Sequence, residues 1–136
     1  MKETKITICG KEVGMAYCAA TENGFEEISG KSIAVFVPVF GKDDDGNDIV
    51  EEPAKATIGD FVTLAVAAIA AYCSRKGMEI PVSTEDILYE ATPAERNGLL
   101  SAIVALRSEW YAVPKVVADT VSEEYGDRKG ERPKNA

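Results

Sequence analysis

The sequence contains no histidine among its 136 residues, and this absence excludes several kinds of enzyme site. Neither a Ser-His-Asp nor a Cys-His catalytic arrangement can be formed. Zinc sites that need histidine ligands are excluded as well, and the proton shuttle that histidine usually provides near neutral pH is missing. We therefore expect a protein that is not an enzyme and that needs no cofactor or metal.

Basic residues and long apolar runs are also few. The chain has 15 Lys and Arg against 23 Asp and Glu, which gives a net charge of −8. Binding to a phosphate backbone depends on clustered Lys and Arg, so we expect no nucleic-acid partner. The longest charge-free apolar stretch, residues 61–73, is shorter than the roughly 20 residues that span a bilayer. The first residues contain no basic segment followed by an apolar one, so we expect no signal peptide. A soluble, cytoplasmic protein is expected.

Cysteine is limited to Cys9, Cys18 and Cys73, an odd number without a CxxC motif. We interpret them as reduced thiols of a protein in a reducing compartment. One alternative stays open at this point. Cys9 and Cys18 flank a predicted hairpin, and a single disulfide could join them.

The length and the 46% of hydrophobic residues are typical of one globular domain. We place this domain at residues 1–118. Residues 119–136 include nine charged side chains and few large apolar ones, so we expect a charged, disordered tail there.

Two segments near the N-terminus predict a β-hairpin. Residues 5–9 and 13–17 alternate between apolar and other side chains, and Gly10 lies between them. Residues 33–40 are β-branched and aromatic and could form another strand. Pro38 lacks an amide donor and would confine that strand to a sheet edge.

The acidic loop at residues 43–48 has two interpretations. If Gly46 is position 6 of an EF-hand loop, Glu52 falls at position 12. However, position 1 would then be Gly41, which has no carboxylate. We favour a solvated Asp-Gly turn, with Ile49 and Val50 beginning a short return strand.

Capping residues predict the helices. Residues 21–28 form a short helix that stops at Gly30, Thr57 caps a helix over residues 58–76, and Ser83 caps a short helix to about residue 89. Thr92, Pro93 and Glu95 open a last helix that runs to about residue 112 before Pro114. The predicted fold class is α+β, with an N-terminal β-hairpin packed on a small bundle of three to four helices.

The helix over residues 58–76 is apolar nearly all round, which is typical of a buried helix or of a contact surface. Together with the last helix it could form a groove for a partner. Trp110 and Tyr111 could belong either to the core or to an interface. The candidate partner-binding residues are Phe61, Ala65, Ala68, Ile69, Tyr72, Leu99, Ile103, Leu106, Trp110 and Tyr111.

Three stretches, in this order, resemble the tail assembly chaperones of tailed phages and prophages, especially those of gut Bacteroidetes. They are ITICGKEVGMAYCAATENGFEEISG, FVTLAVAAIAAYCSRKG and ILYEATPAERNGLLSAIVALRSEWYAVP. The resemblance covers roughly residues 5–115. Its most specific parts are YEATP at residues 89–93 and EWYAVP at residues 109–114.

This resemblance implies a scaffold-like role in the host bacterial cytoplasm. Such chaperones bind the long tape-measure protein, keep it soluble, recruit tail tube subunits and then leave. They have no catalytic residues, and some are also made in a longer, frameshifted form. Another phage structural or head–tail component remains the alternative function, and homo-oligomer formation stays open.

The sequence departs from the family pattern in two places. Asn23 and Gly24 stand where better helix formers are expected. Residues 33–53, with their acidic loop, look like an insertion.

Overall fold

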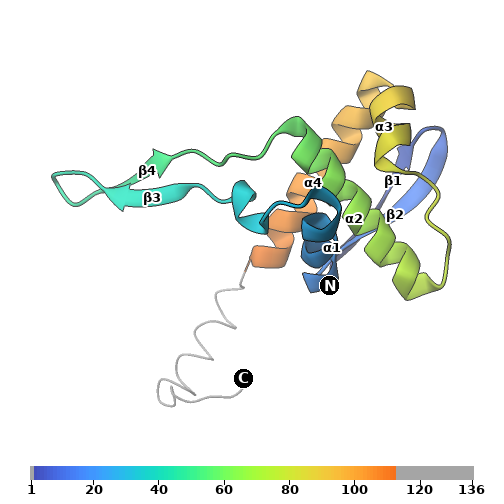
Figure 1. The fold of residues 1–136 in the computed structure, drawn as a ribbon, viewed down its shortest axis with the longest axis horizontal. Helices are drawn as coiled ribbons and strands as arrows, with labels where there is room; N and C mark the ends of the chain where they lie inside the picture. Colours follow the sequence, from blue (N-terminus) through green and yellow to red (C-terminus); the bar gives the residue numbers. More distant parts are fainter. Residues whose placement is uncertain (1, 113–136) are drawn as a thin grey trace, which may run out of the picture.

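The computed structural model describes residues 2–112 and combines two small sheets with four α-helices (Figure 1). The fold is α+β, with the N-terminal β-hairpin packed on helices, as predicted. In chain order the elements are β1 (Lys2–Ile8), β2 (Lys11–Tyr17), α1 (Ala19–Ser29), the 3₁₀ helix η1 (Ile33–Phe36), β3 (Val39–Lys42), β4 (Asp48–Glu52), α2 (Ile58–Lys76), α3 (Thr84–Glu90) and α4 (Pro93–Tyr111). The tail predicted at residues 119–136 lies outside the described residues.

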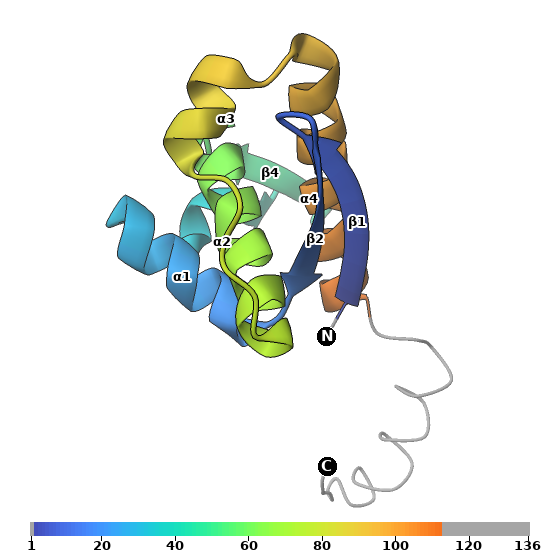
Figure 2. The ribbon, with the colours of Figure 1, turned by 90° about the vertical axis from the view of Figure 1, so that its right-hand side faces the viewer.

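The first hairpin lies at the centre of the core. Strands β1 and β2 pair antiparallel, with Ile6 opposite Val13. The two turn residues, Cys9 and Gly10, both have positive φ, at 52° and 75°, as the favoured two-residue hairpin turn requires. Helix α2 packs against β2 and α4 against β1 (Figure 2). Residues 13–17 of β2 are consequently all buried.

The alternative disulfide between Cys9 and Cys18 is wrong, because both thiols are free and lie at opposite ends of β2. Seven strand residues separate them, which is about 23 Å at 3.3 Å per residue. A disulfide needs Cα atoms within roughly 7 Å. The Cys9 thiol instead lies 3.6 Å from the Asp86 carbonyl oxygen, which attaches the hairpin turn to α3.

Helix α1 starts at Ala19, two residues earlier than predicted, and Gly30 ends it in a left-handed conformation as expected. Packing against α2 explains the glycine at position 24. A Cβ atom there would lie 3.3 Å from the Cβ of Ala67 in α2, closer than ordinary contact. Gly24 therefore allows α1 and α2 to pack closely, a tertiary requirement that helix propensity does not reveal.

Residues 33–40, which could have formed a strand from their composition, begin instead with the 3₁₀ helix η1. The Ser32 hydroxyl accepts a hydrogen bond from the Ala34 amide at 3.1 Å and caps η1. Phe36 is buried there, with its ring edge-on to Phe25 and Phe61 at centroid distances of 5.0 and 4.9 Å. The strand begins only at Val39, beyond the proline.

Helix α2 forms as its capping box predicts and ends at Gly77. Its middle is covered on several sides, since α1, β2, α3 and α4 all pack against it. It is the one helix among residues 2–112 that is long and apolar enough to cross a membrane, and 56% of that window is buried inside the protein. Its apolar circumference is therefore largely core.

A buried carboxylate fixes the start of α2. Asp60 accepts a hydrogen bond from the Thr57 amide at 3.0 Å and forms an ion pair with Lys31 at 2.9 Å. Burial raises the pKa of Asp60, but the Thr57 hydrogen bonds and the Lys31 ammonium outweigh it and hold the pKa below its ordinary value.

We expect Asp60→Asn to destabilise the protein by about 1 kcal/mol at neutral pH, because charge-assisted hydrogen bonds are lost. A depressed folded-state pKa stabilises the protein above the unfolded-state value, and this contribution disappears as pH falls through the folded-state pKa. The difference between wild type and variant should therefore shrink below about pH 4. Urea unfolding at several pH values measures it, and a constant difference would contradict this account.

The last two helices are also capped as predicted, by Ser83 with Asp86 and by Thr92 with Glu95. The Glu95 carboxylate has a second partner, the Gly10 amide at 3.0 Å. The hydrogen bonds from the Thr92 and Gly10 amides lower the pKa of Glu95. Helix α4 ends at Tyr111, and Pro114, which was expected to end it, lies outside the described residues.

Candidate protein-binding surfaces

The candidate residues on α2 and α4 lie mostly in the core. Both helices turn their apolar sides to the β1–β2 hairpin, which fills the groove that the sequence suggested between them (Figure 2). In this packing a partner cannot reach the six buried residues without opening the core. These six are Ala65, Ala68, Ile69, Leu99, Ile103 and Leu106, whereas Phe61, Tyr72 and Trp110 are partly buried and Tyr111 is 51% exposed.

The two aromatic residues at the end of α4 help to hold this helix in place. The Trp110 ring lies 6.4 Å from that of Tyr17, and the hydroxyls of Tyr17 and Tyr111 both donate to the Glu22 carboxylate. The Arg107 guanidinium stacks over the Tyr111 ring at 4.9 Å. Burial, then the hydrogen bond to Glu22, raises the pKa of Tyr17 far above its ordinary value. The tyrosines thus stay protonated and act as structural donors.

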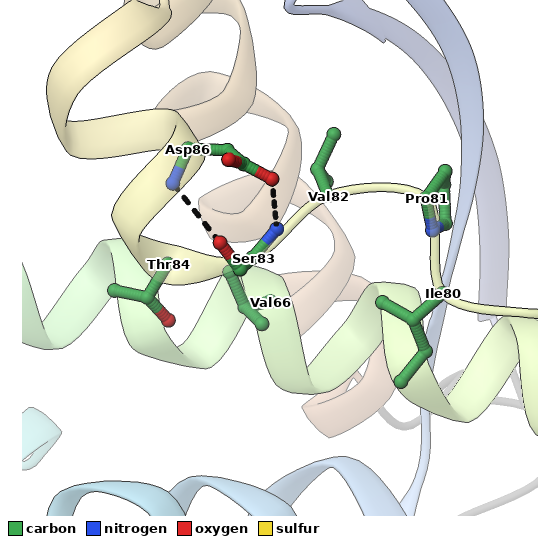
Figure 3. A pocket seen from close by; sticks show the side chains of 7 residues that line it. All are labelled: Val66, Ile80, Pro81, Val82, Ser83, Thr84 and Asp86. Atoms are coloured by element: carbon green, nitrogen blue, oxygen red, sulfur yellow. Dashed lines mark hydrogen bonds between the residues drawn. The ribbon is translucent and has the colours of Figure 1, made fainter.

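An open groove lies where the segment between α2 and α3 crosses α2 (Figure 3). Its volume is about 400 Å³, enough for one or two large apolar side chains. Val66 of α2 contributes one wall, and the Ile80 side chain is 53% exposed. We call this site the α2–α3 groove; its lining residues are Val66, Ile80, Pro81, Val82, Ser83, Thr84 and Asp86.

The polar side chains of the α2–α3 groove that could do chemistry are already used. The Ser83 hydroxyl accepts from the Asp86 amide at 3.0 Å, and the Asp86 carboxylate accepts from the Ser83 amide at 3.0 Å (Figure 3). These bonds cap α3. A ligand in the groove would therefore contact mainly apolar side chains. Such a lining suits apolar side chains of a partner better than a reaction.

A second exposed surface is the hairpin of β3 and β4, which projects away from the helices (Figure 1). We call residues 39–52 the arm. The predicted return strand is present as β4, and Phe40 pairs with Val50 across the hairpin. These two side chains are 64% and 53% exposed, respectively. The strands pair with each other, and neither packs extensively on another described helix or strand.

The acidic turn of the arm is ordered by its own carboxylate. Asp43 accepts hydrogen bonds from the amides of Asp45 and Asn47, at 3.0 and 2.8 Å, as in the Asp-Gly turn that the sequence favoured. Within residues 2–112 no group of three or more Cys, Asp or Glu side chains is arranged to hold a metal ion. The Asp43 carboxylate thus orders the turn through hydrogen bonds from its backbone amides.

The base of the arm is held to η1, where the Lys55 amide donates to the Val35 carbonyl at 2.9 Å. A two-stranded hairpin alone is marginally stable in water, and its free edges invite further pairing. An arm with exposed apolar residues on this hairpin is therefore suited to contact another protein.

Sequence reasoning missed both surfaces. Residues 78–82 alternate as Met-Glu-Ile-Pro-Val. This alternation was the signal for a groove wall, although the segment only connects two helices. In the arm, apolar Ile49 and Val50 stand directly beside the acidic residues 51 and 52. Neither face of this hairpin is consistently apolar. A hairpin of this kind has no side to bury against the helices, and this was the available signal.

Comparison with known proteins gives no relative. No protein-family model, no curated protein and no solved structure matches the chain. The two surfaces and the sequence resemblance are thus the basis for assigning a function.

Proposed function

We propose that the protein is a non-catalytic phage tail assembly chaperone that binds the tape-measure protein in the host bacterial cytoplasm. The resemblance of residues 5–115 to this family motivates the proposal. The observation that carries it is the α2–α3 groove, an open, largely apolar site whose Ser83 and Asp86 side chains are satisfied within the protein.

The groove suits a client made of long amphipathic helices. Such helices present apolar side chains at i, i+3, i+4 and i+7, and one or two of them would fill a groove of about 400 Å³. Burying each large apolar side chain contributes roughly 1.5–3 kcal/mol. Weak, repeated contacts of this kind hold an extended client in solution and release it when tail tube subunits arrive.

The charge of the protein fits this task. Its net charge of −8 keeps a protein with exposed apolar surfaces soluble. The described residues that line the groove include no two free groups that could act as acid and base, because the Asp86 carboxylate caps α3. Both features support binding rather than catalysis.

Ile80→Glu tests the proposal, because it places a charge at the groove without disturbing a buried residue. We expect co-expressed tape-measure protein to become mostly insoluble, with binding weakened at least about tenfold, since an unpaired charge must then be desolvated. Client solubility and co-purification measure the effect.

Ile58→Glu is the matched control, because Ile58 is 60% exposed, is the first residue of α2 and does not line the groove. A glutamate there also stabilises α2, because its negative charge lies at the positive end of the helix dipole. The control should keep the client soluble. Equal loss in both variants, or none in either, would contradict the proposal.

The projecting arm favours a second candidate, a structural tail component that assembles with its neighbours and stays in the particle. A chaperone should be absent from finished particles, whereas a structural component should be present in many copies. Mass spectrometry of purified particles separates the two functions.

A further inference from the structure

An open depression lies at the end of α4 and shares no lining residue with the α2–α3 groove. Its volume is about 530 Å³. Val37 and Tyr111 give it exposed apolar surface, and Arg107 is its one basic residue. We call this site the Arg107 pocket; its lining residues are Val37, Arg107, Ser108, Tyr111 and Ala112.

Two aromatic rings hold the Arg107 side chain at this pocket. The guanidinium carbon lies 4.9 Å from the centre of the Tyr111 ring and 5.7 Å from the centre of the Phe36 ring. Phe36 is buried, and the Tyr111 hydroxyl donates to the Glu22 carboxylate, so both rings are held in place. Attraction to the rings orients the guanidinium and leaves its N–H groups as donors for another partner.

The charge of Arg107 has no carboxylate partner within residues 2–112. The three ion pairs in this part of the chain all belong to lysines, and the Glu22 carboxylate accepts hydrogen bonds from two tyrosine hydroxyls. The Nε atom of Arg107 is also the one buried side-chain nitrogen or oxygen there without a hydrogen-bond partner. The guanidinium is half-buried, so it has lost part of its hydration without gaining an anion in return.

The chemistry of the Arg107 pocket favours a single carboxylate. A guanidinium is a planar fork of N–H donors that can bond both oxygens of a carboxylate. The pocket has one basic side chain on a protein with a net charge of −8, so a polyanion such as a nucleic acid would be repelled. The exposed Val37 and Tyr111 side chains add a surface that a large apolar group can cover.

We infer that the Arg107 pocket binds a segment of another protein in which one Asp or Glu stands beside a large apolar side chain. The carboxylate pairs with the Arg107 guanidinium, and the apolar side chain covers Tyr111 and Val37. Charge complementarity selects this occupant, because the pocket supplies the cation and the apolar surface that such a segment lacks. This binding site goes beyond the proposed function, and it is tested without the tape-measure protein.

The test titrates the full-length, ¹⁵N-labelled protein with blocked dipeptides and follows the Nε–H signal of Arg107 by NMR spectroscopy. Acetyl-Phe-Glu-amide should shift this signal and bind with a Kd on the order of 1 mM. Acetyl-Phe-Gln-amide should bind at least about tenfold more weakly, because it cannot form charge-assisted hydrogen bonds. Acetate should also bind at least about tenfold more weakly, because it has no large apolar group to bury.

Variants at position 107 separate charge from geometry, with the backbone amide signals of Ser108 and Ala112 as the measurement. Arg107→Gln should lose binding of the glutamate peptide at least about tenfold, and Arg107→Lys, which keeps the charge without the fork, at least about fivefold. Arg96→Gln is the matched control, because it removes the same charge from an exposed position near the start of α4. It should bind like the wild type, and urea unfolding shows that each variant is folded.

Several results would overturn the inference. They are no shift of the Arg107 signal at about 20 mM glutamate peptide, equal binding of the glutamine peptide or of acetate, and unchanged binding by Arg107→Gln.

Two further results would assign the pocket to a different occupant and so overturn the inference as well. An Arg107 signal that moves when the protein alone is diluted would indicate a second copy. Failure of the peptide to bind, together with shifted signals of residues 113–136 in Arg107→Gln, would indicate this chain's own segment. Because the client test uses Ile80, which does not line the Arg107 pocket, the two proposals can fail separately.

Discussion

Replacing Ile69 with alanine is expected to lower the free energy of unfolding by about 3 kcal/mol, within the roughly 2–5 kcal/mol range for truncated core residues. Ile69 is fully buried in the middle of α2, inside the core that α2 shares with the hairpin and α4. Its truncation leaves a cavity that the surrounding helices and strands fill only in part. Urea unfolding followed by circular dichroism measures the loss.

Ile58→Ala is the control on the same helix, because Ile58 is 60% exposed. It should change the free energy of unfolding by no more than about 0.5 kcal/mol. If both variants lost equally little stability, the apolar side of α2 would not be core. A partner surface on α2 would then be the better interpretation.

Gly14→Val is expected to destabilise the protein by roughly 2–3 kcal/mol through overpacking. Gly14 is buried on β2, and the Tyr72 ring from α2 lies directly over it. A Cβ atom at position 14 would overlap the ring atoms of Tyr72. The valine must therefore displace the ring or separate the helix from the strand.

A double-mutant cycle identifies the cause. Adding Tyr72→Ala removes the ring, so the double variant should lose much less stability than the sum of the two single variants. Additive losses would show that the strain lies elsewhere.

The helix boundaries could be predicted because their signals are local. Thr57, Ser83 and Thr92 each cap a helix with an acidic residue three positions later, and the structure contains all three capping boxes. The first hairpin was predictable for the same reason, since its alternation and its turn lie within 16 residues, from Lys2 to Tyr17.

The surfaces could not be predicted because they depend on contacts between distant segments. An apolar helix such as α2 looks the same in sequence whether its own chain or a partner covers it, and here its own chain does. The composition around Phe36 allowed a strand, but Phe36 lies in the 3₁₀ helix η1 and packs between Phe25 and Phe61. Gly24 is unfavourable by helix propensity alone, and its reason is the close contact with Ala67 of α2.

The central claim is that a tape-measure helix binds in the α2–α3 groove. Site-specific photo-cross-linking tests it most directly, with a photoreactive side chain at position 80 in one variant and at position 58 in the other, each co-expressed with the tape-measure protein. Both positions are exposed isoleucines; Ile58 is the first residue of α2, and Ile80 lies in the segment between α2 and α3. The account predicts strong cross-linking to the client from position 80 and little from position 58. Equal yields from both positions, or a soluble client that never cross-links to position 80, would contradict it.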